Sequence, residues 1–197
     1  MESLLKTRRL CLRKFTRDDA RYLHQLDNDP EVMRYINGGL PVSLDMIEDR
    51  VLATFVQYDM DRQGLGFWAV VDIHSSAFLG WVCLRPQQDD PATASIGYRF
   101  LLETWGQGYA TEAAQALINL GFTELSLERV IATAYEKNQA SRRVMDKLGL
   151  RFVKTFKVDI AMADTAIHDA TDIWDGDDVE YALDRTDWRK LQCQPRQ

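Results

Sequence analysis

Two glycines separated by one residue, Gly106 and Gly108, are the positions in this sequence best suited to hold a ligand. Alanines and other good helix formers follow them, so we predict that a helix begins at Gly108. The first backbone N–H groups of a helix have no partner within it, and the helix dipole favours negative charge at that end. Glycines leave these donors uncovered. The pattern therefore predicts binding of a phosphate or a diphosphate.

Two other interpretations of this loop stay open. A tight turn between a strand and a helix often carries the same glycines and binds nothing. A nucleotide-binding loop is less favoured, because neither the Gly-Lys-Ser/Thr of a Walker loop nor the third glycine of the dinucleotide fingerprint follows. The segments before the loop also predict antiparallel strands, whereas a dinucleotide loop follows the first strand of a parallel sheet.

A second group of residues with useful chemistry lies in the stretch EKNQASRRVMDKLGL, at 136–150. Asn138 is predicted to cap the N-terminus of a helix, with Ser141 on the first turn and Gly149 at the end. The simplest interpretation is that Asn138 and Ser141 only begin this helix. A functional role for them therefore needs support from elsewhere in the sequence.

The elements around these two groups predict one α+β domain over residues 1–197, with its core at about 8–185 and a C-terminal tail at 186–197. Short connections between three consecutive strands indicate an antiparallel meander before the glycines. Apolar residues at four-residue spacing after Gly108 predict a helix face that packs on the sheet. Strands are expected at 9–15, 66–72, 77–86, 93–102, 129–135, 150–158 and 178–185, and helices at 20–26, 29–36, 44–58, from 109 onward, and at 139–148.

Charge and composition limit the partners. The net charge of −6 and the pI near 5.1 argue against nucleic acid and are compatible with a cationic small molecule or a basic peptide. No apolar run approaches a membrane span and no secretory signal opens the sequence, so we expect no membrane partner. Three scattered cysteines suit a reducing, cytoplasmic compartment. The histidines and cysteines lack metal-ligand spacing, and no metal is expected.

Two long stretches resemble the GNAT acyltransferase superfamily, and within it the RimJ/RimL-like N-acetyltransferases most closely. They are IGYRFLLETWGQGYATEAAQAL at 96–117 and RVIATAYEKNQASRRVMDKLGLRFV at 129–153. The likeness covers most of the chain, from TRRLCLR at 7–13 to VEYAL at 179–183. It implies a single GNAT-like domain, with a mixed and mostly antiparallel central sheet flanked by helices. It also implies an enzyme that transfers an acetyl group from acetyl-CoA to an amine.

The resemblance also assigns roles to residues. The pyrophosphate of acetyl-CoA would lie on the backbone N–H groups that begin at the glycines, and its pantetheine arm along the end of the preceding strand. Asn138 would lie against the pantetheine and Ser141 beside the thioester sulfur. Trp105 stands where the superfamily pattern has Gln or Arg, which removes a side-chain donor but not the backbone donors. The implied cofactor-binding residues are Tyr98, Arg99, Phe100, Gly106, Gln107, Gly108, Tyr109, Ala110, Thr111, Asn138 and Ser141.

The implied reaction is direct attack of a primary amine on the bound thioester. A backbone N–H near Arg99 or Phe100 is the candidate donor to the developing oxyanion. Many members protonate the departing thiolate with a tyrosine, but that position is Met145 in this chain, and methionine cannot donate a proton. Ser141 is the expected replacement and the main catalytic candidate.

The general base is left open by the sequence. Superfamily enzymes often place a glutamate on the strand before the glycines, near the positions of Ala94 and Ser95 here. Glu103, Tyr135 and Glu136 are the candidates, although a solvated carboxylate is the simpler interpretation of Glu103. A chain of water molecules would suffice for an α-amine, whose pKa is about 8, whereas a lysine amine at about 10.4 needs more help.

The acceptor is expected to bind between residues 29–41 and an acidic segment at 159–180, which could attract an ammonium group or could be a solvated loop. The resemblance favours a protein N-terminal α-amine, while polyamines, amino acids and aminoglycosides stay open. A non-catalytic acyl-CoA-binding regulatory module is the alternative of another class, because Met145 and the missing strand glutamate both depart from the catalytic pattern. A homodimer is compatible with folds of this kind.

Overall fold

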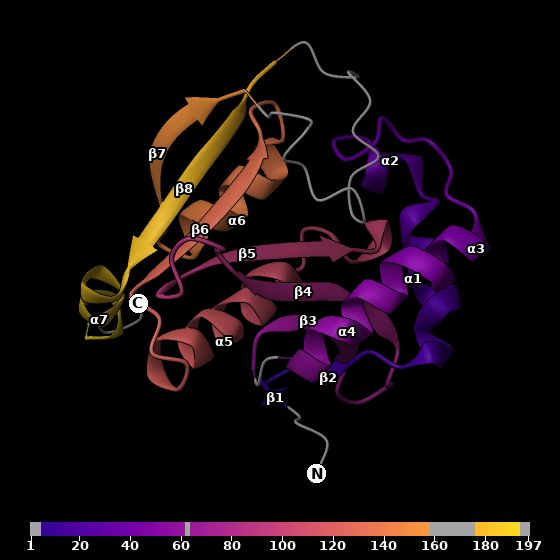
Figure 1. The fold of residues 1–197 in the computed structure, drawn as a ribbon, viewed down its shortest axis with the longest axis horizontal. Coiled ribbons are helices and arrows are strands. Elements are labelled where there is room, and N and C mark those ends of the chain that lie inside the picture. Colours follow the sequence, from indigo (N-terminus) through magenta and orange to yellow (C-terminus); the bar gives the residue numbers. More distant parts are fainter. Residues whose placement is uncertain (1–4, 62–63, 158–175, 194–197) are drawn as a thin grey trace.

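The computed structural model describes residues 5–61, 64–157 and 176–193 of the 197-residue chain. Its strands form one eight-stranded sheet in the order β1-β2-β3-β4-β5-β6-β8-β7 (Figure 1). Neighbouring strands are antiparallel, except that β5 and β6 are parallel. The predicted α+β fold with a mixed, mostly antiparallel sheet is confirmed. The strands are β1 (Leu5–Lys6), β2 (Leu10–Lys14), β3 (Gly66–Asp72), β4 (Phe78–Pro86), β5 (Thr93–Phe100), β6 (Arg129–Tyr135), β7 (Arg151–Phe156) and β8 (Asp178–Asp184).

Helices α2 and α3 begin at residues whose side chains cap them. The carboxylate of Asp29 accepts the N–H of Glu31 at 2.9 Å, and Pro30 takes the first position of α2. The Ser43 hydroxyl caps α3 in the same way. The helices are α1 (Ala20–Asp27), α2 (Pro30–Met33), α3 (Leu44–Met46), α4 (Ala53–Asp61), α5 (Tyr109–Thr123), α6 (Gln139–Lys147) and α7 (Arg185–Gln192), with 3-10 turns at Arg17–Asp19 and Leu102–Thr104.

Two of the predicted helices have a different local form in the structure. The helix expected at 29–36 is the short α2, because the Met33 carbonyl accepts the N–H groups of Ile36, Asn37 and Gly39 and closes a turn. The helix expected at 44–58 runs from α3 to α4 through a π-helical stretch, Ile47–Leu52. Apolar spacing predicts a helical face there but does not separate π from α turns.

Both ends of the chain carry elements absent from the prediction. Strand β1 is only two residues long, and its pairing with β2 forms the N-terminal edge of the sheet. Helix α7 begins at Arg185 and covers most of the expected tail at 186–197. Its Trp188 ring packs 5.3 Å from that of Phe122, and its indole N–H donates to Asn119 Oδ1 at 2.9 Å. The tail is therefore attached to α5.

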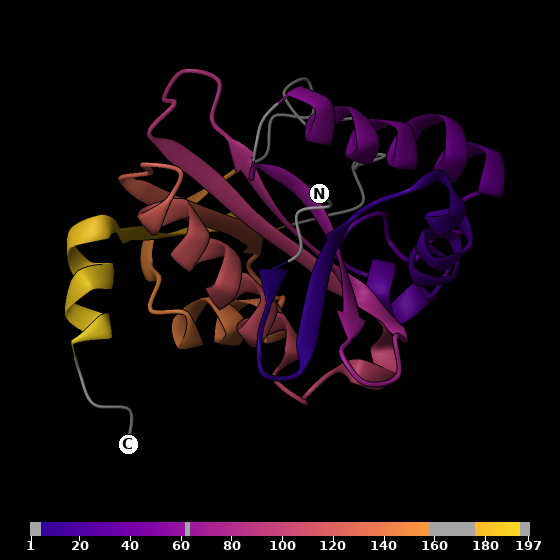
Figure 2. The ribbon, with the colours of Figure 1, turned by 90° about the horizontal axis from the view of Figure 1, so that it is seen from below.

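The sheet carries a hydrophobic core on each face. On one face, α5 packs against β4 and β5, and on the other face α1 and α4 cover β3 and β4. Figure 2 shows α4 and α5 on opposite sides of the sheet. Each fully buried leucine of these cores contributes about 2 kcal/mol to stability. The face predicted for α5 is buried through Ala113, Ala114, Leu117, Ile118, Gly121 and Phe122.

The sheet opens between β5 and β6. These two strands pair only over residues 93–95 and 129–131 in the part of the chain that the structure describes. Beyond that point β5 continues beside β4, and β6 continues beside β8, so the two strands diverge (Figure 1). The C-terminal half of β5 therefore has an open edge, and α6 follows the diverging end of β6.

Candidate active site

The glycine loop, residues 106–108, leads from a 3-10 turn into α5. Gly106 and Gly108 have left-handed φ values of +76° and +81°, which are unfavourable for residues other than glycine. Gly108 is the N-cap and offers no side chain to the helix. The first helical hydrogen bond runs from Glu112 N–H to the Gly108 carbonyl at 3.0 Å. The N–H groups of residues 109–111 therefore lack a partner within the helix.

The space around the glycine loop fits a phosphate group. A Cβ on Gly106 would meet no atom within 4 Å, so the volume beside that residue is open. A Cβ on Gly108 would meet only Arg9 Nη2 within that distance, at 3.5 Å. Uncovered amides and a nearby guanidinium are the donors that a diphosphate requires. The residues present therefore fit the diphosphate expected from the resemblance.

Arg9 reaches the glycine loop from the turn between β1 and β2, and the sequence analysis did not single it out. Its Nε donates to Glu112 Oε2 at 2.7 Å, and its Nη1 donates to the Gln107 carbonyl at 3.0 Å. Glu112 Oε1 also accepts from the Thr7 hydroxyl at 2.6 Å. Although partial burial alone would raise the pKa of Glu112, these hydrogen bonds hold that pKa below its usual value. Arg9 and Glu112 are 103 positions apart, so no local pattern predicts the pair.

The register of β5 determines which peptide groups face its open edge. Leu101 N–H donates to the Leu79 carbonyl at 2.9 Å, and the alternation of an antiparallel ladder turns Arg99 toward β4 in the same way. Tyr98 and Phe100 consequently direct their peptide groups to the opposite side, toward the open edge. The register favours these two residues over Arg99 for main-chain contacts with a ligand.

Trp105 uses its indole N–H within the protein. Nε1 donates to the Phe100 carbonyl at 2.8 Å, while the ring is partly exposed. The indole N–H therefore stabilises the end of β5 and is not available to a phosphate, in agreement with the expected loss of a side-chain donor at this position. At the open edge, the N–H of Phe100 and the peptide groups around Tyr98 are left for a ligand.

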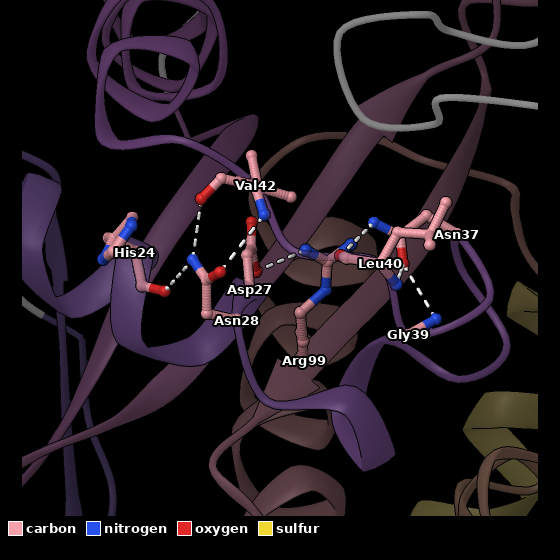
Figure 3. Close-up of polar contacts among 8 residues, drawn as sticks. All are labelled: His24, Asp27, Asn28, Asn37, Gly39, Leu40, Val42 and Arg99. Carbon is pink, nitrogen blue, oxygen red and sulfur yellow. Dashed lines mark hydrogen bonds and ion pairs between the residues drawn. The ribbon is translucent and has the colours of Figure 1, made fainter.

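The side chain of Arg99 points to the other face of the sheet. Its Nη1 lies 2.5 Å from Asp27 Oδ1, and the two side chains are only 7% and 4% exposed. Figure 3 shows this pair joining β5 to the end of α1, beside Asn28. The Asn28 carboxamide bridges the carbonyls of His24 and Val42 at 2.9 and 2.8 Å. The segment that follows α2 is thus tied to α1 next to a buried ion pair.

Ser141 and Tyr98 meet across the opening between β5 and β6. The Tyr98 hydroxyl lies 3.0 Å from both the hydroxyl and the carbonyl oxygen of Ser141. Burial raises the pKa of Tyr98 to about 12, although its hydrogen bond to Ser141 opposes the shift. Tyr98 therefore keeps its proton throughout the neutral range. The sequence predicts a role only for the main chain of Tyr98, because nothing local indicates that its side chain reaches a residue of α6 that is 43 positions away.

Asn138 caps α6 as predicted. Its Oδ1 accepts the N–H of Ser141 at 3.1 Å, which fixes the first turn of the helix. Its Nδ2 donates to no residue within the described ranges. Cofactor binding by Asn138 stays a prediction, and Nδ2 is the group that would donate to the cofactor. Met145, where many superfamily members have tyrosine, is 1% exposed and lies in the core.

The candidate bases lie in different surroundings. Glu103 is exposed on the 3-10 turn, and its carboxylate forms no hydrogen bond with the described part of the chain. Tyr135 is buried at the end of β6, with its ring 5.7 Å from that of Tyr35. A Cβ on Gly176 would come within 2.7 Å of the Tyr135 hydroxyl and 2.6 Å of Glu136 Oε1. None of the three candidates is brought to Ser141 by a hydrogen bond, since Ser141 bonds with Tyr98 and Asn138.

Most of the acidic segment expected to attract the acceptor lies outside the described residues, including Trp174 within it. Of its carboxylates, Asp177, Asp178 and Glu180 are described. Burial and then the charge of Asp177 raise the pKa of Asp178. Glu180 lies 3.6 Å from Lys154 across β7 and β8. The acceptor side of the site is thus described only in part.

None of the helices in the described residues is both long and apolar enough to cross a lipid bilayer. Those residues also contain no group of three His, Cys, Asp or Glu side chains placed to hold a metal ion.

Comparison with known proteins identifies relatives over most of the chain. The sequence profile of the family described as "Acetyltransferase (GNAT) domain" matches residues 9–151. The protein YkkB of Bacillus subtilis is 36% identical over 72% of this chain and 80% of its own length. The FsC-acetyl coenzyme A-N(2)-transacetylase of Aspergillus fumigatus is 30% identical over 95% of this chain and 79% of its own length. A GNAT-family acetyltransferase structure from Bacillus anthracis superposes with a TM-score of 0.74 at 30% identity, covering 93% of this chain and 99% of that one.

Proposed function

Because the chain belongs to the GNAT acetyltransferase family, and is therefore an acyltransferase that uses acetyl-CoA, we propose that it acetylates a primary amine by direct attack, without a covalent enzyme intermediate. The observation that carries the proposal is the arrangement at the end of β5. Uncovered amides of α5 follow that end in the chain, and the Tyr98–Ser141 hydroxyl pair is attached to the same strand. Diphosphate binding and protonation of the leaving group thus depend on one strand end.

Separate groups of residues bind the cofactor and act on the reacting atoms. Acetyl-CoA supplies the acetyl group as a thioester. The N–H groups of residues 106–111 hold its diphosphate, and the open edge at Tyr98 and Phe100 holds its amide-containing arm as an added strand would be held. The Phe100 N–H donates to the oxygen on which negative charge develops. Asn138 orients the arm through Nδ2. Ser141 donates its hydroxyl proton to the departing sulfur and regains a proton through water from the amine, which loses one in the reaction.

An α-amine at a protein N-terminus is the first candidate acceptor. The described residues bring no carboxylate to the Tyr98–Ser141 pair, and Glu103 faces solvent. An α-amine with a pKa of about 8 is largely deprotonated at slightly alkaline pH, whereas a lysine amine at about 10.4 is not. An acceptor that needs little help from a base therefore fits this site best, with a solvent chain or Tyr135 completing proton removal.

A small amine is the second candidate acceptor. The relative that supports it is the Aspergillus fumigatus transacetylase, which is 30% identical along nearly the whole chain. Its name describes transacetylation at an N(2) position, which supports an amine acceptor other than a protein N-terminus. Polyamines and aminoglycosides belong to the same class.

One catalytic domain extends through α7, since Trp188 and Arg185 attach that helix to α5. The three cysteines of the sequence are all free, which supports a reducing, cytoplasmic environment. A homodimer stays part of the proposal, with its interface unassigned.

Thiol release from acetyl-CoA across a panel of amines tests the proposed function. The panel contains peptides with free N-termini, the same peptides with blocked N-termini and an internal lysine, polyamines and aminoglycosides. We expect release with free N-terminal peptides and a mass increase of one acetyl group on the α-amine. Release only with small amines would select the second candidate. Protein that binds acetyl-CoA but releases no thiol with any amine would contradict N-acetyltransferase activity.

A further inference from the structure

We infer that Arg9 is a direct ligand of the coenzyme A diphosphate, held in position for that task by Glu112. The inference rests on the proposed cofactor site at the glycine loop. It adds a side chain from the N-terminal edge of the sheet to a site otherwise made of backbone amides.

The guanidinium of Arg9 has one nitrogen free on the side where the ligand would lie. Nε is bound to Glu112 and Nη1 to the Gln107 carbonyl. Nη2 makes no hydrogen bond to any residue within the described ranges. That same nitrogen lies 3.5 Å from the position that a Gly108 Cβ would occupy, which is the surface left bare by the glycine. An arginine that binds protein through two nitrogens and presents the third beside uncovered amides is suited to a phosphate oxygen.

Contacts on several sides hold the guanidinium in this position before any ligand arrives. Its Cζ lies 4.4 Å from the centre of the Tyr109 ring, on the first turn of α5. The carboxylate that binds Nε also accepts the backbone N–H of Arg9 at 3.0 Å and the hydroxyl of Thr7 at 2.6 Å. Little rotamer freedom is therefore left to lose on binding, which favours affinity. Arginine's planar fork matches this geometry, and the single ammonium of lysine does not.

Arg9 also has an indirect effect, which an experiment must separate from direct contact. Glu112 lies on the first turn of α5, so its negative charge would repel a diphosphate at the same helix end. The ion pair with Arg9 compensates that charge. Removing Arg9 alone would both delete a donor and expose the repulsion. Removing both charges deletes the donor and leaves no repulsion.

The first test measures coenzyme A binding by calorimetry for four proteins. They are the wild type, Arg9→Gln, the double variant Arg9→Gln/Glu112→Gln, and Arg8→Gln. Arg8 is exposed on the same turn, so Arg8→Gln changes the net charge as Arg9→Gln does but removes no contact with Glu112 or the glycine loop. We expect the double variant to bind about tenfold more weakly than the wild type, as loss of one charge-assisted hydrogen bond predicts, and Arg8→Gln to bind within about twofold. Wild-type affinity in the double variant would overturn direct contact.

The second test identifies which phosphate Arg9 meets. Dephospho-coenzyme A keeps the diphosphate but lacks the ribose 3′-phosphate, and acetylpantetheine lacks every phosphate. We expect the double variant to lose the same roughly tenfold in affinity for dephospho-coenzyme A and to keep wild-type kcat/KM with acetylpantetheine. A loss seen with coenzyme A but not with dephospho-coenzyme A would overturn the diphosphate assignment. An equal loss with acetylpantetheine would overturn the contact, because it would indicate general damage to the site.

Folding and the proposed cofactor site are checked separately. Urea unfolding of each variant without ligand reports whether the turn between β1 and β2 still anchors α5, and the double variant avoids an unpaired charge if Arg9→Gln alone is unstable. Failure of the wild type to bind coenzyme A would remove the proposed cofactor site itself. Wild-type binding that is unchanged in the double variant would remove only the role of Arg9.

Discussion

At the scale of single residues, the Tyr98–Ser141 pair has fewer protons than acceptors. The phenol has one proton, so when it donates to the Ser141 carbonyl, the Ser141 hydroxyl is free to donate to the phenol oxygen. With a departing sulfur nearby, the serine hydroxyl can turn to that sulfur while the phenol donates its own proton to the serine oxygen. Tyr98 is then a positioning residue and Ser141 the proton donor.

This division of roles predicts non-additive effects of two substitutions. Ser141→Ala should lower kcat by about a hundredfold, with the Kd for acetyl-CoA largely unchanged, because the lost proton donor acts on the leaving group. Tyr98→Phe should lower kcat by about tenfold, since the serine hydroxyl stays but is no longer oriented. The double variant should be no slower than Ser141→Ala. Thiol release and calorimetry measure the two quantities, and multiplied effects in the double variant would contradict a shared role.

Gly108 offers a second prediction at this scale, on charge at the helix N-terminus. Gly108→Asn and Gly108→Asp place side chains of nearly the same shape on a left-handed residue, and asparagine tolerates that conformation. Any strain of about 1 kcal/mol is common to both. Aspartate alone adds a negative charge beside the amides that hold the diphosphate, so its Kd for acetyl-CoA should be at least about tenfold higher than that of the asparagine variant. Equal Kd values would place the diphosphate elsewhere.

At the scale of elements, the buried pair of Asp27 and Arg99 joins α1 to β5. Figure 3 shows the two side chains directed at each other between these elements. A buried charge that loses its partner is costly, so Asp27→Ala should lower the free energy of unfolding by about 3 kcal/mol. Asp27→Ala/Arg99→Met removes both charges and should cost clearly less. Urea unfolding measures both, and an Asp27→Ala variant within about 0.5 kcal/mol of wild type would contradict a structural role for the pair.

Elements with a strong local pattern were predictable from the sequence. Strands β3 and β6 have the predicted bounds, because both runs are rich in β-branched and aromatic residues. The run at 66–72 ends at Asp72, and Glu136 follows the run at 129–135. Helix α6 begins after Asn138 and ends before Gly149, where its caps predict. Helix α7 was missed since Trp188 and Leu191 are its only large apolar residues, and the π-helical stretch was missed because it keeps the apolar spacing of an α-helix.

The site was predictable only in its local parts. Uncovered amides at the glycine loop and the cap at Asn138 each depend on a few consecutive residues. The contacts of Arg9 with Glu112, and of Tyr98 with Ser141, depend on how distant strands and helices pack, and nothing near those residues in the sequence indicates them. The register that turns Tyr98, and not Arg99, toward the open edge likewise depends on pairing with β4.

At the scale of the whole molecule, the sheet consists of two groups of strands joined by the short pairing of β5 and β6. One group runs from β1 to β5 and the other contains β6, β8 and β7. A ligand at the end of β5 lies where the groups separate, so its binding should affect both. The ligand should nevertheless protect the amides that it contacts before it affects the rest of either group.

Hydrogen exchange with and without saturating acetyl-CoA separates these two effects. The N–H groups of residues 109–111 lack helical partners, so they should exchange quickly in the free protein and become at least about tenfold slower when bound. The open edge at Tyr98 and Phe100 should respond likewise at early times. Amides of α4, on the other face of the sheet, should be protected only where exchange requires global unfolding. Acetyl-CoA at a hundred times its Kd raises the free energy of global unfolding by about 2.7 kcal/mol. Early protection in α4 without protection at 109–111 would show that the cofactor does not bind at the end of β5, and that α5 has only a structural role.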